Sequence, residues 1–180
     1  MGAALFGDVN PGGRLPVTFY RADQAMPAFD DYAMEGRTYR YFHGTPLYPF
    51  GYGLSYTRFD YGKPSLDAPR IADHGTLKVQ VEVTNAGKRA GDEVVQLYVR
   101  RLAAGAGDAQ QTLRGFQRVH LAAGERRTVT FDLDAQQALR EYDDARGAYV
   151  VRPGAYEIRI GGSSADARVR SRFTVEASRD

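Results

Sequence analysis

Apolar and polar side chains alternate through the C-terminal two-thirds of the chain. Leu77, Val79, Val81 and Val83 are separated by polar or charged residues, which is typical of a strand with one buried and one solvated face. The same alternation returns several times before the C-terminus. We therefore predict strands at residues 77–84, 95–100, 113–121, 128–133, 149–151, 156–160 and 169–175.

The segments between these strands carry turn residues. Residues 143–147 have the composition of a hairpin loop. Gly161 and Gly162 are expected to end the strand at 156–160, and residues 103–110 form a small, polar loop. Residues 135–142 suit one short helical turn, with Leu139 and Tyr142 on one side.

Seven short strands, with a turn signal every ~8–12 residues, predict an immunoglobulin-like β-sandwich. The chain has no Trp and no Cys, so the hallmarks of antibody domains are missing and a fibronectin type III-like sandwich is the better description. The alternating apolar positions of the predicted strands should face the core. The predicted core residues are Val79, Val81, Leu97, Phe131, Ile158 and Phe173.

Residues 36–57, called here the aromatic stretch, follow a different pattern. Seven Tyr and Phe side chains occur in it without a period of two, and glycines and prolines interrupt it. Pro46 and Pro49 lack the N–H that a helix needs, so we expect an ordered connection without helix or strand. Its rings are expected to pack against something large, at the join between two architectures.

The first 35 residues have the pattern of an α/β unit that is almost finished. Residues 3–6 suit the last turn of a helix with Gly7 as its cap, and residues 10–13 suit a turn. Residues 14–20 are expected to be an extended edge strand, because they contain Pro16. Residues 21–35 are expected to be irregular. A single strand cannot form a sheet, so the rest of that sheet would come from additional chain.

Composition excludes several functions. The chain has 180 residues, 43% hydrophobic and 26% charged, with a net charge of +2 and no basic run, so a nucleic-acid partner is not expected. Three separated histidines and no cysteine give no basis for a metal site or thiolate chemistry. No apolar run approaches the ~20 residues of a membrane span. The first residues also lack a signal-peptide pattern.

Six sequence blocks follow one another in a distinctive order. They are GDVNPGGRLPVTF, GRTYRYF, PLYPFGYGLSYT, VTNAGKRAGDEVVQLYV, LRGFQRVHL and RPGAYEIRIGGSS. Together they closely resemble the C-terminal part of family 3 glycoside hydrolases, the β-glucosidase and β-xylosidase family. The resemblance covers nearly the whole chain.

The resemblance implies a fold, a division of the chain and a parent activity. In this family a (β/α)8 barrel precedes an α/β sandwich domain and a fibronectin type III-like domain. Residues 1–20 would be the end of the α/β sandwich domain, residues 21–58 an aromatic-rich connector, and residues 59–180 the fibronectin type III-like domain. The family hydrolyses β-glycosides with retention, through a carboxylate nucleophile and a carboxylic acid/base ~5–5.5 Å apart.

Neither catalytic motif of the family occurs in this chain, so no catalytic residue is assigned. Loop carboxylates at Asp30, Asp31, Glu35, Asp143 and Asp144 are better explained by turns and solvation than by a catalytic pair. No cofactor is implied, and no metal. The chain alone is predicted to be inactive.

Three residues of the aromatic stretch are candidates for contact with substrate. Aromatic faces stack on sugar rings, and an arginine can bind a sugar or a carboxylate, so Arg37, Tyr39 and Tyr41 are conceivable site residues. The favoured interpretation is that these rings join the sandwich to the α/β domain, with the arginines at that interface. No substrate-binding residue is therefore assigned.

Three functional hypotheses remain. In the first, the chain is a non-catalytic C-terminal portion of a retaining β-glycosidase, acting on a β-glucoside or, next, a β-xyloside. Its partners would be the barrel and α/β domains and, through them, a β-linked oligosaccharide. The second is a stand-alone carbohydrate-binding or adhesion module, and the third a scaffold without ligand. The aromatic stretch favours the first, since a free module would expose it. The resemblance permits a periplasmic or secreted location.

Overall fold

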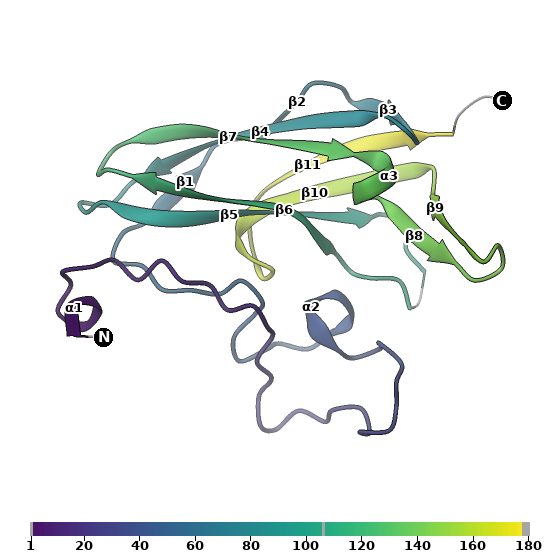
Figure 1. Cartoon of the computed structure of the whole chain (residues 1–180), viewed down its shortest axis with the longest axis horizontal. Helices are drawn as coiled ribbons and strands as arrows, with labels where there is room; N and C mark the ends of the chain where they lie inside the picture. Colours follow the sequence, from purple (N-terminus) through teal and green to yellow (C-terminus); the bar gives the residue numbers. More distant parts are fainter. Residues whose placement is uncertain (1, 106, 178–180) are drawn as a thin grey trace.

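In the computed structural model, which describes residues 2–105 and 107–177, two β-sheets stack on each other and the N-terminal third of the chain runs along one side of them (Figure 1). The predicted domain ends at Met1 and Asp180, and Ala106 of the predicted loop, lie outside the described residues. The fold is mainly β and contains the predicted fibronectin type III-like sandwich.

The first sheet is built around one long strand, β4. Strands β1 and β2 pair with successive stretches of β4, and β7 pairs antiparallel with nearly all of it. The bounds are β1 Phe59–Tyr61, β2 Ser65–Leu66, β4 Thr76–Asn85 and β7 Arg126–Asp134.

The second sheet has five strands in the order β3-β11-β10-β5-β6. Only the pairing of β11 with β3 is parallel. Its bounds are β3 Arg70–Ala72, β11 Asp166–Glu176, β10 Gly154–Ser163, β5 Gly91–Arg101 and β6 Thr112–Leu121. A separate hairpin of β8 Arg140–Asp143 and β9 Ala148–Val151 lies at one end of the sandwich (Figure 1).

The core lies between the sheets and is formed by the alternating apolar positions. Burial alternates residue by residue along β4, whose Leu77, Val79, Val81 and Val83 are fully buried. Each such side chain stabilises the fold by roughly 1.5–3 kcal/mol relative to an exposed one. All six predicted core residues are buried: Val79, Val81, Leu97, Phe131, Ile158 and Phe173.

The long strands were predicted correctly, and the glycines near the end of β10 were not. The strand continues through Gly161 and Gly162 to Ser163, with register shifts against β11. A Cβ on Gly161 would lie 1.6 Å from the carbonyl oxygen of Asp166. The glycine is needed because two backbones approach closely in a bulged hairpin, so it does not end the strand.

The helical turn predicted at 135–142 is shorter than expected. Helix α3 spans Ala135–Ala138, and the Asp134 carboxylate caps it by accepting the N–H of Gln137 at 2.9 Å. Leu139 and Tyr142 do not share one side of a helix as predicted, since Leu139 follows the helix and is buried. Tyr142 lies instead in β8 and is exposed, because β-pairing with β9 starts directly after the helix.

The N-terminal third also departs from prediction. Helix α1, Gly2–Leu5, ends before Gly7 at φ +83°, as expected, and residues 21–35 are irregular. Residues 14–20 form no strand, only an isolated bridge between Phe19 and Tyr48. Helix α2, Thr38–Tyr41, contradicts the prediction that the aromatic stretch has no helix, since one turn fits before Pro46.

Candidate functional site

Tyr39 joins the aromatic stretch to the sandwich. Its ring stacks on Phe50 at 4.5 Å between centroids and meets the edge of Tyr98 of β5 at 5.8 Å. Its hydroxyl accepts the backbone N–H of Leu113 of β6 at 3.0 Å. The short helix α2 therefore positions an aromatic ring against the five-stranded sheet.

A buried amide on β5 extends this contact. Gln96 Nε2 donates to the carbonyl oxygens of Gly51 at 3.2 Å and Gly162 at 2.5 Å, and Tyr98 donates its hydroxyl proton to Gln96 Oε1 at 2.5 Å. Gly51 has φ +80°, and a Cβ there would lie 2.1 Å from Gln96 Oε1. Only glycine allows this approach without displacing the amide.

Backbone groups complete the contact between the aromatic stretch and the sandwich. Ser164 donates its N–H to the carbonyl of Phe50 at 2.9 Å. Gln110 donates its backbone N–H to Arg40 O at 2.7 Å and its side-chain amide to Phe42 O at 2.8 Å. The aromatic stretch is thus hydrogen-bonded to the loops that flank β6 and β10.

The three candidate residues have three different surroundings. Arg37 holds the preceding loop by donating to the carbonyl oxygens of Ala28 and Asp31, at 3.0 and 2.6 Å, and of Ala33 at 3.1 Å. Tyr39 packs on the sandwich, whereas Tyr41 lies under the Arg40 guanidinium at 5.3 Å and lines a pocket. They do not converge on one place.

Three of the five loop carboxylates, Asp31, Glu35 and Asp143, have structural partners. Asp31 accepts the N–H of Ala33 at 2.8 Å, and Glu35 lies 3.5 Å from His43. Asp143 is buried and paired with Arg152 at 3.2 Å. Among residues 2–105 and 107–177, no group of three or more His, Asp or Glu side chains is arranged to hold a metal ion.

A buried carboxylate at Glu93 was not identified from the sequence. Arg14 of the N-terminal segment lies 2.8 Å from Glu93 Oε2, and Tyr61 donates its hydroxyl proton to Oε1 at 2.6 Å. Burial raises the pKa of Glu93, opposed by the Tyr61 hydrogen bond and the charge of Arg14. The signal was present, because Glu93 falls on the alternating face of Val95 and Leu97.

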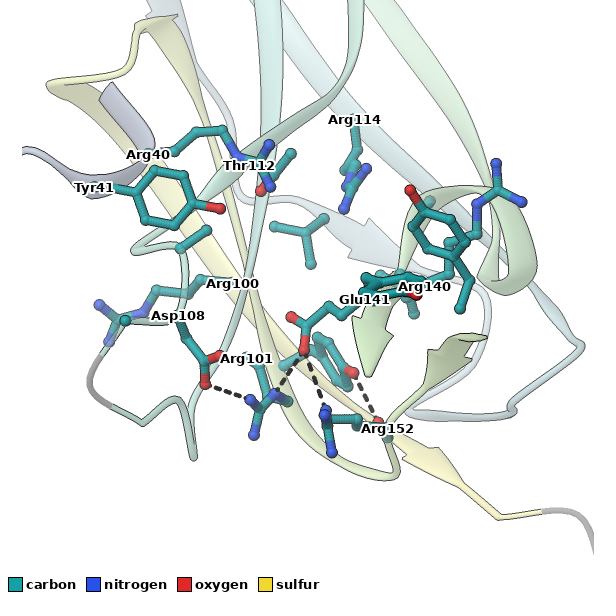
Figure 2. Close-up of a pocket in the computed structure, with 18 of the residues that line it drawn as sticks. Arg40, Tyr41, Arg100, Arg101, Asp108, Thr112, Arg114, Arg140, Glu141 and Arg152 are labelled. Atoms are coloured by element: carbon teal, nitrogen blue, oxygen red, sulfur yellow. Dashed lines mark hydrogen bonds and ion pairs between the residues drawn. The ribbon is translucent and has the colours of Figure 1, made fainter. Parts of the chain in front are cut away.

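An arginine-lined pocket of about 500 Å³ opens between the aromatic stretch, the loop after β5 and the β8–β9 hairpin (Figure 2). Its ionic side chains are Arg40, Arg100, Arg101, Arg114, Arg140, Arg152, Asp108, Glu141 and Asp144. Burial lowers the pKa of the Arg114 guanidinium, and the neighbouring charge of Arg40 lowers it further. Sequence reasoning missed this pocket because its arginines come from segments far apart in the chain.

Exposed apolar side chains are concentrated in the N-terminal third. Among the described residues, thirteen large hydrophobic side chains between residues 5 and 56 are exposed, against three in the sandwich. The thirteen are Leu5, Phe6, Val9, Val17, Phe19, Met26, Phe29, Tyr32, Met34, Leu47, Tyr48, Leu54 and Tyr56, and we call them the apolar surface. Leu15, Tyr48 and Leu54 line an open groove of about 490 Å³ within this region.

Two family models match the chain. The glycosyl hydrolase family 3 C-terminal domain matches residues 1–56, and the fibronectin type III-like domain matches residues 93–164. The chain thus matches, in this order, a family 3 C-terminal domain and a fibronectin type III-like domain.

Curated relatives agree with both matches. A xylan 1,4-β-xylosidase of Xylanibacter ruminicola is 46% identical over 90% of this chain and 18% of its own length. A β-xylosidase of Formosa agariphila is 46% identical over 89% of this chain and 22% of its own length. A periplasmic β-glucosidase of Salmonella typhimurium is 39% identical over 89% of this chain and 22% of its own length.

Solved structures give the same result. A β-glucosidase from Erythrobacter marinus superposes with a TM-score of 0.80 at 40% identity, over 97% of this chain and 23% of that one. A β-glucosidase from Kluyveromyces marxianus gives a TM-score of 0.86 at 33% identity, over 97% of this chain and 22% of that one.

The chain corresponds to the C-terminal part of a glycoside hydrolase family 3 enzyme of the β-glucosidase and β-xylosidase type. It spans about a fifth of the length of the curated relatives it matches. No helix among the described residues is long and apolar enough to cross a membrane.

Proposed function

We propose that this chain is the non-catalytic C-terminal portion of a retaining β-glycosidase that hydrolyses a β-glucoside or β-xyloside. In this role it stabilises and orients the barrel and α/β domains, which supply the nucleophile and the acid/base. Residues 1–20 would complete the α/β domain, residues 21–58 would connect, and residues 59–180 would form the attached sandwich.

The apolar surface is the observation that carries the proposal. Exposed large hydrophobic side chains lie mostly between residues 5 and 56, and Phe29 and Tyr32 are 101% and 92% exposed. Large apolar patches on a protein surface usually mark a site of contact with another protein surface. Residues 1–56 match a family 3 domain. We therefore infer that the other domains of a family 3 enzyme cover these apolar side chains.

The few large hydrophobic side chains that the sandwich exposes support this function over that of a stand-alone binding module. A carbohydrate-binding module would place aromatic rings on a sheet face or in the sandwich loops. The described sandwich exposes Phe116, Tyr142 and Tyr149, whereas the apolar surface contains thirteen side chains. The larger set thus lies outside the sandwich, which supports packing against a covalently linked domain over binding of a free ligand.

The experiment is a graft onto a relative. The C-terminal segment of the Formosa agariphila β-xylosidase, which matches this chain over 22% of that enzyme, is replaced by the present chain. We expect the truncated relative to lose activity, the graft to recover it, and the isolated chain to show no turnover. Aryl β-xylosides and aryl β-glucosides are assayed in parallel, since relatives of both names occur.

Two results would contradict the proposal. Turnover of either aryl glycoside by the isolated chain would show that catalysis resides within it. A graft that folds but has no more activity than the truncated relative would show that the chain does not orient the catalytic domains.

A further inference from the structure

The arginine-lined pocket has the size and position of a binding site. Its volume of about 500 Å³ falls within the ~300–1,000 Å³ that ligand sites usually have. Strands β5 and β6 form its floor, with Val99 and Thr112 among the lining residues, while Tyr41 borders it on the aromatic stretch and Tyr142 on the β8–β9 hairpin. Rigid strands therefore support its walls.

Some of the pocket's arginines are neutralised by carboxylates. Arg101 lies 2.5 Å from Asp108 and 3.4 Å from Glu141, and Arg152 lies 3.6 Å from the same Glu141. Arg100 is 3.3 Å from Glu157. Figure 2 shows the ion pairs of Arg101, Asp108, Glu141 and Arg152 gathered on one side of the pocket.

Arg140 has no ion pair within the described residues, and its guanidinium lies over the Tyr149 ring at 5.1 Å. Arg40 and Arg114 also lack an ion pair there. The Nε atom of each is buried and has no hydrogen-bond partner. Figure 2 shows both side chains across the pocket from the ion pairs. Burial, and after it the charge of Arg40, lowers the pKa of Arg114. Two half-buried cations on one side of a pocket are costly unless an anion lies between them.

The rim adds the features of a sugar site. Tyr142 and Tyr149 are 54% and 64% exposed and meet edge to face at 5.3 Å, although both line the pocket. Exposed rings beside a polar cavity suit a ligand with an apolar face and many hydroxyl groups. A guanidinium binds a carboxylate through two parallel hydrogen bonds, and two guanidiniums do so more tightly.

We propose that the pocket binds an acidic saccharide, with Arg40 and Arg114 holding the sugar's carboxylate and Tyr142 lying beside the pyranose ring. The choice of a saccharide rests on the proposed function, whereas the choice of an anion rests on the two unpaired arginines alone. The proposal concerns binding of the acidic saccharide and includes no cleavage step.

The test is a binding titration of the full 180-residue chain at about 0.15 M salt, in which NMR detects the binding. Sodium glucuronate is the probe, glucose the uncharged sugar of the same ring size, and sodium sulfate the anion without a sugar. We expect glucuronate to bind at least tenfold more tightly than glucose and more tightly than sulfate. No turnover is measured, so the result does not depend on the hydrolytic role.

Matched variants locate the site. Arg114→Gln and Arg40→Gln should each weaken glucuronate binding about tenfold, the loss expected for one charged hydrogen-bonding partner. Arg172→Gln removes an equal charge from an exposed position of β11 and should leave binding unchanged. Tyr142→Ala should weaken glucuronate binding while leaving sulfate binding intact. Having two arginine variants keeps the test valid if one of them fails to fold.

Three outcomes would overturn the proposal. If glucuronate does not bind, or if Arg172→Gln weakens it as much as Arg114→Gln, the pocket is not the site. If sulfate binds as tightly as glucuronate, the pocket recognises an oxyanion without regard to the sugar. If the isolated chain binds glucuronate but the graft does not, a carboxylate of the catalytic domains fills the pocket.

Discussion

Two neighbouring carboxylates on β5 respond to pH in opposite ways. Glu93 is buried, and burial raises its pKa above the ordinary value of 4.5. The hydrogen bond with His120 lowers the pKa of Asp92 below 3.8, with further help from Arg118. His120 Nδ1 lies 2.6 Å from Asp92 Oδ1. The alternation of β5 places the two carboxyls on opposite faces, which explains the difference.

Glu93→Gln should change the pH profile of stability. A raised folded-state pKa gives stability that is complete below the unfolded pKa and is lost as pH rises through the folded pKa. Glutamine cannot titrate, so the melting temperature of the wild-type chain minus that of the variant should decrease between about pH 4 and pH 7. Thermal unfolding at several pH values across that range measures it.

Asp92→Asn should change the pH dependence of stability in the opposite direction. A lowered folded-state pKa gives stability that is present above 3.8 and is lost as pH falls through the folded pKa. The melting temperature of the wild-type chain minus that of this variant should therefore decrease as the pH falls toward about 3. If both variants gave the same slope, the buried and surface roles assigned to Glu93 and Asp92 would be incorrect.

At the scale of elements, contact between the aromatic stretch and β5 depends on Gly51. Alanine at φ +80° is strained, and its Cβ would displace the buried Gln96 amide. Gly124, at φ +75°, is strained in the same way without crowding, because a Cβ there would meet nothing within 4 Å. We expect Gly124→Ala to cost about 1–2 kcal/mol and Gly51→Ala about 3 kcal/mol or more.

Denaturant unfolding of both variants measures the difference. Equal losses would mean that left-handed strain alone matters at Gly51 and that the Gln96 contact contributes little. A loss at Gly51 that is also accompanied by a smaller denaturant slope would indicate that the aromatic stretch detaches before the sandwich unfolds.

Elements with a long repeating pattern were predictable, and short or bulged ones were not. Strand β4 alternates over ten residues, so its burial follows from periodicity alone. Strands β1, β2 and β3 have two or three residues each, too few for a period, and exist because β4 and β11 offer free edges. Gly161 was misread because a close backbone approach leaves no trace in the hydrophobic pattern.

At the scale of the whole molecule, the apolar surface should affect association more than folding. Phe6 and Phe29 are 85% and 101% exposed, so Phe6→Ser and Phe29→Ser remove little buried area. We expect each to reduce self-association of the isolated chain, measured by sedimentation velocity, while its stability changes by less than about 0.5 kcal/mol. In the graft the same changes should lower stability.

Phe116→Ser is the matched control, since Phe116 is 66% exposed but belongs to β6. It should leave the stability of the graft unchanged. A graft equally insensitive to Phe6→Ser, Phe29→Ser and Phe116→Ser would argue that no domain covers the apolar surface.

The candidate site followed from the sequence only in part. An aromatic run broken by prolines and glycines indicated a packed connection, and Tyr39 does pack on the sandwich. The pocket needed the fold, because Arg40, Arg114 and Arg152 are far apart in the chain and line one pocket only in the folded structure. Local patterns report periodicity, whereas a site assembled from distant segments has no local pattern.

The hydrogen bonds of Gln96 have a consequence for how the sandwich can be inherited. A fragment beginning at Phe59 would contain every strand, but its Gln96 amide, Leu113 N–H and Ser164 N–H would lose Gly51 O, Tyr39 Oη and Phe50 O as partners. The fragment would also lose the ring of Tyr39 from against Tyr98, so water would reach a side chain that is 2% exposed in the full chain. The sandwich is therefore not a portable cassette. A genetic exchange that shuffles it between enzymes must carry the aromatic stretch along.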